Sequence, residues 1–430
     1  MMKRDFEKVL LNWKLNKNKK PLLIQGARQV GKTYIVRKFA RENYKNVVYL
    51  NFEENKSLND IFINDLNPDR IVAVIGVLYD VEVNEDTVFI FDEVQASERA
   101  ITSLKYFEES DNLYNVIATG SMLGIYMNRE EFSFPVGKVQ LETMRPMTFK
   151  EFLIAKGKSS IIKMIESSYK KNEYFPLHDM ALGLYREYLL VGGMPEAVYT
   201  YISTNDLDKV RQVQNLINNS YIADMQKYAS NEDSTKLYDI FKSIPVHLGK
   251  DNKKFKYSVI KSGARAKDYA YPIHWLEMSG IINKLERISE GSIPIAAYRE
   301  PSFFKVYLSD VGLFSRMINM PYEKVLVDDK ILGIYKGTLA ELYVLEELVA
   351  SGVEPYYWNP NQNTELDFVY QSSQGEIIPI EVKSGQRTRS KSLDKFMKKY
   401  GAEAIRLSTK NFGYEDGIKS VPLYAIWCIR

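Results

Sequence analysis

The sequence has a single cysteine and no long hydrophobic run. Cys428 stands alone in the last strand-like run of the chain, so no internal disulfide framework can form, and this cysteine usage is typical of a reducing compartment. No apolar stretch approaches the roughly 20 residues that a membrane-spanning helix needs. The N-terminal stretch MMKRDFEKVLLNWKLNKNKK carries too many charges for a signal peptide. We therefore expect a soluble, cytoplasmic protein with no membrane partner.

The chain also has little excess charge of either sign. It carries 58 Lys and Arg against 55 Asp and Glu, a net charge of +3, which by itself does not argue for a nucleic-acid partner. Any basic surface must therefore be local. Hydrophobic residues make up 45% and charged residues 26% of the sequence, so ordinary globular cores are possible. The length of 430 residues predicts about two to four domains.

The most informative stretch is LLIQGARQVGKT, residues 22–33. An apolar run precedes the phosphate-loop pattern G-x-x-x-x-G-K-(S/T), which consists of Gly26, Ala27, Arg28, Gln29, Val30, Gly31, Lys32 and Thr33. The glycines let backbone N–H groups face phosphate oxygens, and the helix that starts near Lys32 adds its positive dipole end. We expect Lys32 to reach the β- and γ-phosphates and Thr33 to hold Mg²⁺ through its hydroxyl. The alternative is a Gly-rich turn without a ligand, and the strand and helix on either side argue against it.

A second motif ends in two acids. Residues 88–93, VFIFDE, place Asp92 and Glu93 after four apolar residues, which predicts a buried parallel strand with acids at its carboxyl end, where α/β folds bind ligands. In this Walker B interpretation, Asp92 binds Mg²⁺ directly or through water, and Glu93 polarises the attacking water. The alternative is a solvated acidic turn after a strand.

A third strand-like run, VIATGS at residues 116–121, ends in small polar residues. Thr119 or Ser121 is expected to orient water near the γ-phosphate, but Ser121 fits the N-cap of a following helix equally well. Alternating strands and helices predict an α/β fold with a doubly wound parallel sheet. The order of the three motifs, and the lack of a guanine-reading N-K-x-D motif, favour an AAA+-type ATPase over a small GTPase.

Six stretches together resemble a known family. They are KPLLIQGARQVGKT, FIFDEVQ, ATGS, MRPMTFKEFL, YLLVGGMPEAV and FKVYLSDVGLF, and they span nearly the whole chain. They resemble the bacterial and archaeal AAA-type ATPases that carry a C-terminal DUF4143 domain. The resemblance implies ATP and Mg²⁺ as cofactors, without a defined biological role.

Residues 150–200 have the pattern of helices and are predicted to form a lid. The resemblance implies that Gly193 and Pro195 lie against the adenine base, and the alternative is a turn between helices with Pro at a first helical position. Related ATPases often complete their site with an arginine from a neighbouring subunit. Relatives carry a Gly-Arg pair where this chain has Lys138, and lysine cannot make a bidentate phosphate contact. Arg129 and Arg145 are the other candidates.

The middle of the chain predicts a winged helix. Residues 257–261 and 264–278 resemble the helices of a helix-turn-helix around Ser262-Gly263, and residues 281–288 and 304–308 have the pattern of wing strands. Arg265, Lys267 and His274 would face DNA, whereas Pro272 would kink the second helix. The alternative is a module that contacts only protein.

The C-terminal stretch carries a second constellation. Residues 337–350 predict a helix with Glu341, residues 356–358 and 365–370 predict strands, and a Gln374-Gly375 turn leads to the strand 377–383. Asp367 followed by Glu381-x-Lys383 matches the core of PD-(D/E)xK nucleases. Residues two apart share a face of a strand, so Glu381 and Lys383 point together.

The chemistry of this constellation follows from its residue types. Asp367 and Glu381 are the predicted ligands of Mg²⁺ or Mn²⁺, with Glu341 completing the carboxylates, and Lys383 would stabilise the attacking hydroxide or the phosphate. Basic residues that could follow a phosphate backbone come next: Arg387, Arg389, Lys391, Lys395, Lys398 and Lys399. The alternative is an exposed strand face with an ordinary charge pair and a solvated basic helix.

Together the patterns predict four parts. Residues 1–150 form a P-loop AAA+-type ATPase domain, 151–225 a helical lid, 226–322 a winged-helix-like domain and 323–430 a restriction-endonuclease-like α/β domain. The predicted function is ATP hydrolysis coupled to a C-terminal module that binds or cleaves DNA or RNA. The alternative is a nucleotide-regulated switch or scaffold with slow hydrolysis and a silent nuclease fold that contacts a protein partner or another copy of the chain.

Overall fold

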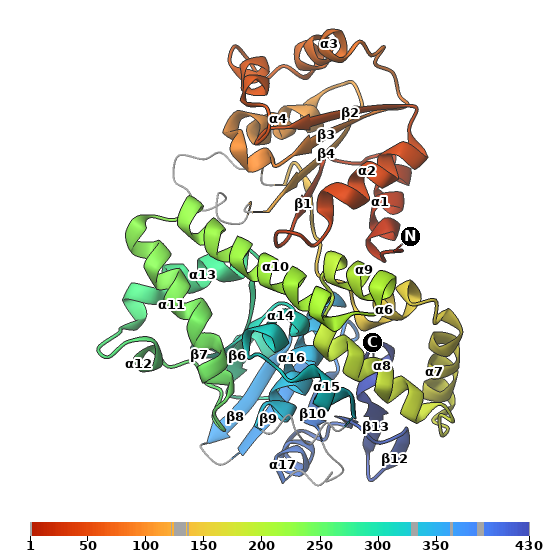
Figure 1. The fold of residues 1–430 in the computed structure, drawn as a ribbon, viewed down its shortest axis with the longest axis vertical. Helices are drawn as coiled ribbons and strands as arrows, with labels where there is room; N and C mark the ends of the chain where they lie inside the picture. Colours follow the sequence, from red (N-terminus) through yellow and green to blue (C-terminus); the bar gives the residue numbers. More distant parts are fainter. Residues whose placement is uncertain are drawn as a thin grey trace. The chain divides into compact units, whose positions relative to one another are not determined.

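The computed structural model describes residues 2–121, 123, 135, 137–327, 334–361, 364–384 and 391–429. The chain divides into two compact units. One consists of Lys3–Arg145 with the short segment Met278–Gly280, and the other is made up chiefly of Pro146–Glu277 and Ile281–Arg430. Each unit is built around one β-sheet (Figure 1).

In the described part of the first unit, five parallel strands are ordered β2-β3-β4-β1-β5. Their bounds are β1 Leu22–Gln25, β2 Asn46–Asn51, β3 Thr87–Asp92, β4 Asn115–Gly120 and β5 Gln140–Thr143. Strands β3 and β4 are buried along their whole length, because the central strands of a parallel sheet are covered on both faces. Parallel strands end at the same edge of the sheet, so Gln25, Asp92 and Gly120 come together there. The predicted P-loop parallel sheet is confirmed.

Helices and short turns connect these strands. They are α1 Phe6–Leu15, α2 Lys32–Asn43, η1 Lys56–Phe62, α3 Pro68–Tyr79, η2 Val94–Ala96 and α4 Glu98–Glu109. Local sequence sets where they begin: the Asn67 side chain accepts from the Arg70 N–H ahead of Pro68, and Ser97 accepts from the Ala100 N–H. Such caps satisfy backbone donors that have no partner inside the helix.

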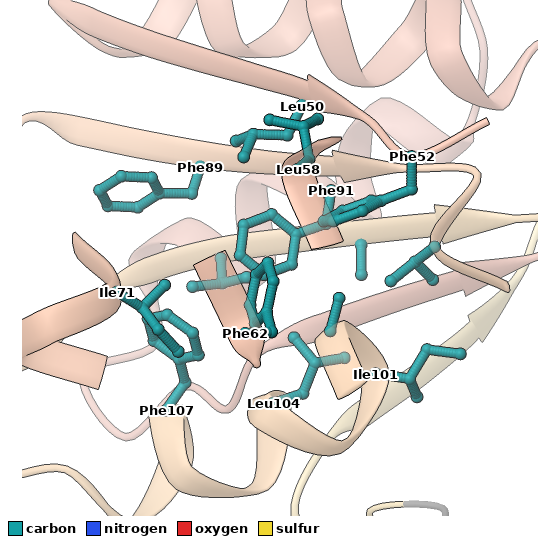
Figure 2. Packing of buried hydrophobic residues seen from close by; sticks show 14 of the residues in the cluster. Leu50, Phe52, Leu58, Phe62, Ile71, Phe89, Phe91, Ile101, Leu104 and Phe107 are labelled. Atoms are coloured by element: carbon teal, nitrogen blue, oxygen red, sulfur yellow. The ribbon is translucent and has the colours of Figure 1, made fainter. Parts of the chain in front are cut away.

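Phenylalanine rings fill the core beside β2 and β3 (Figure 2). The ring centroid of Phe91 lies 5.7 Å from that of Phe52 and 6.0 Å from those of Phe62 and Phe107. Burying one such side chain contributes roughly 1.5–3 kcal/mol, and edge-to-face contacts add to this. Because Phe91 directly precedes Asp92, this packing fixes the carboxyl end of β3.

Helices make up the first half of the second unit. They are α6 Phe149–Ala155, α7 Ser159–Lys171, α8 His178–Val191, α9 Pro195–Thr204, α10 Leu207–Tyr228, α11 Asn231–Leu248, α12 Tyr257–Ile260 and α13 Ala266–Met278. The motif MRPMTFKEFL has a structural explanation, because Thr148 and Glu151 form a reciprocal capping box at the start of α6. Pro272 lies inside α13.

A mixed sheet forms the rest of this unit. Over the residues described, its eight strands are ordered β12-β13-β11-β10-β9-β8-β6-β7. The bounds are β6 Ile282–Ile288, β7 Arg299–Leu308, β8 Tyr356–Asn361, β9 Thr364–Gln371, β10 Ile377–Lys383, β11 Ala404–Ser408, β12 Gly413–Glu415 and β13 Ile418–Pro422. The other elements are η3 Ile295–Tyr298, α14 Val311–Met317, α15 Tyr322–Val327, α16 Tyr335–Ala350, α17 Lys391–Tyr400 and η5 Leu423–Cys428. The expected last strand around Cys428 is therefore wrong, since this run is the 3-10 helix η5.

The order of this sheet bears on the domain organisation. Strands β9 and β10 form the predicted antiparallel hairpin, and β6 and β7 form an antiparallel pair that joins the same sheet through β8. Strands from the predicted middle and C-terminal parts thus share hydrogen bonds in one sheet. The four-part division of the chain remains a prediction. In the portion of the chain that the structure describes, no helix is long and apolar enough to cross a membrane.

Candidate functional site

The phosphate loop occupies residues 26–31, between β1 and α2. Gly26, Gln29 and Gly31 adopt positive φ angles of 148°, 67° and 94°. A Cβ atom on Gly26 would lie 2.1 Å from the carbonyl oxygen of Met144. Glycine is therefore required at position 26 both by conformation and by space.

Lys32 is buried under this loop. Its Nζ donates hydrogen bonds to the carbonyl oxygens of Gly26 and Ala27, each at 2.9 Å. Arg4, which the sequence did not single out, donates to the carbonyl oxygens of Val30 at 3.1 Å and Arg145 at 2.6 Å. Lys32 thus binds the start of the loop, and Arg4, from the N-terminal segment, binds its end.

Asp92 lies where three strands end. Thr33 Oγ1 donates to Asp92 Oδ2 at 2.9 Å, and Thr119 Oγ1 donates to Asp92 Oδ1. Asp92 is only 2% exposed, so these contacts orient a buried carboxylate. Of the two candidates in the run VIATGS, Thr119 contacts Asp92, and Ser121 lies near Glu93.

Tyr49 on β2 is a further partner of Asp92, and the sequence interpretation missed it. Its hydroxyl donates to Asp92 Oδ2 at 2.6 Å. Burial raises the pKa of Tyr49 to about 12, and the hydrogen bond to Asp92 adds to this shift, so the hydroxyl keeps its proton at neutral pH. One signal was available: residues 47–52, VVYLNF, have the pattern of a strand that contains Tyr49, and the carboxyl ends of parallel strands meet at one edge of a sheet.

Glu93 has a strained backbone and a defined side-chain position. Its φ is 50°, in the left-handed region, which costs roughly 1–3 kcal/mol when a residue other than glycine is held there. Gln95 Nε2 donates to Glu93 Oε2 at 2.5 Å, and Ser121 Oγ lies 3.5 Å from the same oxygen. The motif FIFDEVQ contains Gln95, but no pattern around it predicted a role for this residue.

Three residues are candidates for the arginine-finger position: Lys138, Arg129 and Arg145. Lys138 forms ion pairs with Glu108 at 2.9 Å and Glu109 at 3.2 Å, both in the last turn of α4. Arg129 lies outside the described residues, and the finger role of Arg145 remains a prediction. Lys138 is thus tied to its own unit by two carboxylates.

Gly193 and Pro195 belong to the second unit. The Gly193 N–H donates to Asp310 Oδ2 at 2.6 Å, and its carbonyl accepts from the Met147 N–H at 2.7 Å. Pro195 is the first residue of α9. These contacts join the motifs GGMP and SDVGLF through a buried hydrogen bond between Gly193 and Asp310. The predicted contact with adenine remains a prediction.

The C-terminal constellation centres on β9 and β10. Their antiparallel register pairs Phe368 with Ile380, so the next pair along places Asp367 across from Glu381. The Val382 N–H donates to Asp367 Oδ2 at 2.8 Å, and Lys383 forms an ion pair with Glu381. The structure therefore brings Asp367, Glu381 and Lys383 together, as the spacing predicted.

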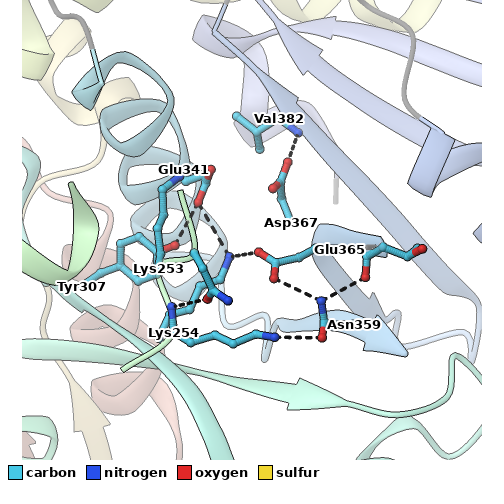
Figure 3. A network of polar contacts seen from close by, with 11 residues as sticks. Lys253, Lys254, Tyr307, Glu341, Asn359, Glu365, Asp367 and Val382 are labelled. Carbon is cyan, nitrogen blue, oxygen red and sulfur yellow. Dashed lines mark hydrogen bonds and ion pairs between the residues drawn. The ribbon is translucent and has the colours of Figure 1, made fainter. Parts of the chain in front are cut away.

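Glu341 on α16 joins this group, in the polar network shown in Figure 3. Helix α16 packs against β10, and the Glu341 carboxylate accepts from Lys253 Nζ and, at 3.0 Å, from the Tyr307 hydroxyl. Lys305 on β7 lies 4.0 Å from Glu341 and 2.7 Å from Glu365. The sequence interpretation missed Lys253 and Lys305; the only signal for Lys305 was a lysine inside the apolar strand pattern FFKVYL.

In this carboxylate–lysine cluster, each of three glutamates has a lysine as its ion-pair partner. Burial alone would raise the pKa of Glu341, but the charges of Lys253 and Lys305 outweigh it and the pKa falls below its usual value. Burial and the neighbouring Glu381 and Glu341 raise the pKa of Asp367 well above its usual value, which favours its protonated form. Three lysines lie beside these acids: Lys253 pairs with Glu341, Lys305 with Glu365, and Lys383 with Glu381.

The sequence predicts that Asp367 and Glu381 bind a metal ion, and the geometry of the cluster adds no support to this prediction. Among the residues that the structure describes, no group of three or more His, Cys, Asp or Glu side chains is arranged to hold a metal ion. Binding by Asp367 and Glu381 stays a prediction, since lysines supply the positive charge that a cation would bring.

The structure describes some of the basic residues that are predicted to contact nucleic acid. Arg265, Lys267 and His274 are exposed. In the basic run, Lys395 donates to Thr364 Oγ1 at 3.1 Å and Lys399 pairs with Glu290 at 2.7 Å. Arg387 and Arg389 lie outside the described residues.

Three family models match the chain. A model described as AAA domain matches residues 18–153, one described as domain of unknown function DUF8612 matches 182–324, and one described as domain of unknown function DUF4143 matches 336–426. The phosphate loop, the acid pair and the parallel sheet define a P-loop ATPase of the AAA class. With the third match, the models support an AAA-type ATPase that carries a C-terminal DUF4143 domain.

Individual relatives are more distant. An uncharacterized protein of Methanocaldococcus jannaschii, MJ1544, is 26% identical over 197 residues, which are 46% of this chain and 39% of that protein. The Walker-type ATPase PABY2304 of Pyrococcus abyssi is 13% identical with a TM-score of 0.43, covering 74% of this chain and 96% of its own. AMPPCP-bound DnaA from Aquifex aeolicus is 11% identical with a TM-score of 0.30, covering 63% and 86%. The family assignment rests on the models and the motifs.

Proposed function

We propose that this protein binds ATP with Mg²⁺ at the edge of the parallel sheet and hydrolyses it. The observation that carries the proposal is the convergence of Thr33 and Thr119 on the buried Asp92 carboxylate. These residues fit a magnesium ion, because a threonine hydroxyl and a carboxylate are oxygen ligands of the kind Mg²⁺ takes. Thr33 and Asp92 would hold the ion, which would supply positive charge to the phosphates.

The roles of the other residues follow from chemistry. The N–H groups of residues 26–31 would bind phosphate oxygens, and Lys32 would leave the carbonyl oxygens of Gly26 and Ala27 for the γ-phosphate. Glu93 would accept a hydrogen bond from the attacking water, with Gln95 and Ser121 fixing its carboxylate.

The test is ATP turnover by full-length variants. Lys32→Ala should abolish turnover, and Glu93→Gln should lower it by about 10² or more while nucleotide binding persists. Lys38→Ala is a matched control, because Lys38 also lies on α2 and only pairs with Glu7, at 2.7 Å. Turnover retained in Lys32→Ala would refute the assignment.

For the C-terminal cluster, we consider two functions: a nuclease-like or nucleic-acid-binding module, and a silent fold that contacts protein. The grouping of Asp367, Glu381 and Lys383 supports a nuclease-like or nucleic-acid-binding module. The neutralisation of Glu341 and Glu365 by Lys253 and Lys305 supports the alternative, a silent fold that contacts a protein partner or a second copy of the chain. We keep the four-part domain division and the winged-helix interpretation of residues 226–322 as parts of this proposal.

One assay separates the two. Wild type, Asp367→Ala and Lys253→Ala are incubated with single- and double-stranded DNA and RNA in Mg²⁺ or Mn²⁺. Cleavage by wild type that is lost in Asp367→Ala would support the nuclease. No cleavage by wild type would support the silent fold, and cleavage gained only in Lys253→Ala would show that the lysine silences the site.

A further inference from the structure

The Asp92 carboxylate has more donors than the motif accounts for. Oδ2 accepts from the Thr33 hydroxyl at 2.9 Å and the Tyr49 hydroxyl at 2.6 Å. Oδ1 accepts from the Thr119 hydroxyl and from the Glu93 N–H at 3.1 Å. These four donors hold the carboxylate in one orientation and leave it little freedom to rotate.

Tyr49 is itself fixed from two sides. The Arg37 guanidinium, on α2, lies over the Tyr49 ring at 4.6 Å from its centroid, and Asn51 Nδ2 donates to the Tyr49 hydroxyl at 3.3 Å. The register of β2 and β3 pairs Asn51 with Asp92, and residues 49 and 51 share one face of β2. A hydroxyl held in this way serves better as a permanent donor than as a group that moves aside for a ligand.

We propose that Tyr49 is a positioning residue of the magnesium site. Its hydroxyl holds Asp92 Oδ2 toward Thr33, so that the Thr33 hydroxyl donates its hydrogen bond to Asp92 and keeps an oxygen lone pair available for the metal. This inference rests on the proposed ATPase function, and it deepens that function by adding a residue that touches neither nucleotide nor metal.

The expected effect falls on metal affinity. Removing the Tyr49 hydroxyl takes away one of the two hydroxyl donors to Asp92 Oδ2 and leaves that of Thr33. The carboxylate can then rotate more freely. Loss of a group that orients a metal ligand typically costs 10–100-fold in metal affinity or activity. Binding of the nucleotide without metal should be unchanged, because Lys32 Nζ donates to the carbonyl oxygens of Gly26 and Ala27, whereas the Tyr49 hydroxyl donates to Asp92.

The experiment compares full-length wild type, Tyr49→Phe and Tyr114→Phe. Tyr114 is a matched control: its hydroxyl donates to Asp69 at 2.6 Å, as Tyr49 donates to Asp92, but it precedes the amino end of β4, at the opposite edge of the sheet. Mn²⁺ binding in the presence of a non-hydrolysable ATP analogue is measured by electron paramagnetic resonance. Analogue binding in EDTA and the Mg²⁺ dependence of ATP turnover are measured alongside.

We expect the Mn²⁺ dissociation constant and the Mg²⁺ concentration for half-maximal turnover to rise about tenfold in Tyr49→Phe, with binding in EDTA unchanged. Arg37→Gln, which keeps the hydroxyl but removes the group over the ring, should give a smaller rise in the same direction and serves if Tyr49→Phe does not fold. Unchanged or tighter Mn²⁺ binding in both variants would overturn the inference, and tighter binding would show that Tyr49 competes with the metal. Wild type that binds Mn²⁺ with the analogue but does not turn over ATP would refute the proposed function and leave Tyr49 judged by the binding data alone.

Discussion

Lys305 is a fully buried lysine, and replacing it tests whether the C-terminal cluster is held together by charge. Its side chain is 2% exposed, and its Nζ lies 2.7 Å from Glu365 and 4.0 Å from Glu341. Lys305→Met keeps most of the side-chain volume and removes the charge. Two carboxylates then lose a cation inside the second unit.

The magnitude follows from what each carboxylate can do afterwards. Breaking a buried ion pair by removing one partner typically costs about 3–5 kcal/mol. The Glu365 side chain is 30% exposed and can turn toward water, whereas Glu341 keeps Lys253 and Tyr307 as partners. We therefore expect the lower end of that range, a loss of about 3 kcal/mol in the free energy of unfolding.

Chemical denaturation followed by tryptophan fluorescence measures this loss. Three of the four tryptophans, Trp275, Trp358 and Trp427, belong to the second unit. Lys305→Met/Glu365→Gln should recover a large part of the loss, because the unpaired charge at position 365 is gone. Lys254→Met is the matched control, since Lys254 donates to the neutral Asn359 at 2.9 Å and should cost only about 1 kcal/mol. Wild-type stability in Lys305→Met at pH 8 would show that the charge argument is wrong.

Three further changes test other parts of the structure. Burial raises the pKa of Asp310 from 3.8 to about 6; since the folded-state pKa lies above the unfolded value, the stability that protonated Asp310 contributes is present below about pH 4 and is lost as the pH rises through 6. The Asp310→Asn variant has no group that ionises at this position. Between about pH 4 and pH 6, the unfolding free energy of wild type should therefore fall by about 3 kcal/mol relative to that of the variant. A pH-independent difference would contradict the prediction. Phe91→Ala should destabilise the first unit by about 3–5 kcal/mol, measured by guanidinium unfolding with Trp13 as the probe, and a loss under about 1 kcal/mol would argue against the ring cluster as its core. Gly26→Ala places a methyl group 2.1 Å from the Met144 carbonyl and should weaken ATP-analogue binding by roughly tenfold or more; wild-type affinity would exclude the described loop geometry.

The phosphate loop and the acid pair could be recognised in the sequence because each is a short contiguous motif. Gly26, Lys32 and Thr33 fall in one stretch, and the strand–loop–helix pattern around them is local. Asp92 and Glu93 follow an apolar run whose burial in a parallel sheet is expected from composition alone. The choice between Thr119 and Ser121 was different, because both stand at the end of one strand and only side-chain geometry shows that Thr119 donates to Asp92.

The residues that were missed come from remote segments. Arg4 meets the loop from the N-terminal end, and Lys253 and Lys305 meet Glu341 from a loop and a strand far along the chain. A lone lysine or arginine has no local pattern that distinguishes a buried partner from a solvated side chain. Lys305 reaches the carboxylates because the β6–β7 pair joins the sheet through β8, and Lys253 reaches them from the loop after α11.

The sequence by itself determined the class of protein, the phosphate loop and its acid, and the grouping of Asp367, Glu381 and Lys383, because each depends on spacing within one strand, one loop or one hairpin. Tertiary structure decided the rest. It placed Tyr49 on Asp92 through the pairing of β2 with β3, and it set lysines from β7 and the loop after α11 against the C-terminal carboxylates. The physical reason is that hydrogen bonds and ion pairs act over a few ångströms in space, whatever the separation of their residues along the chain.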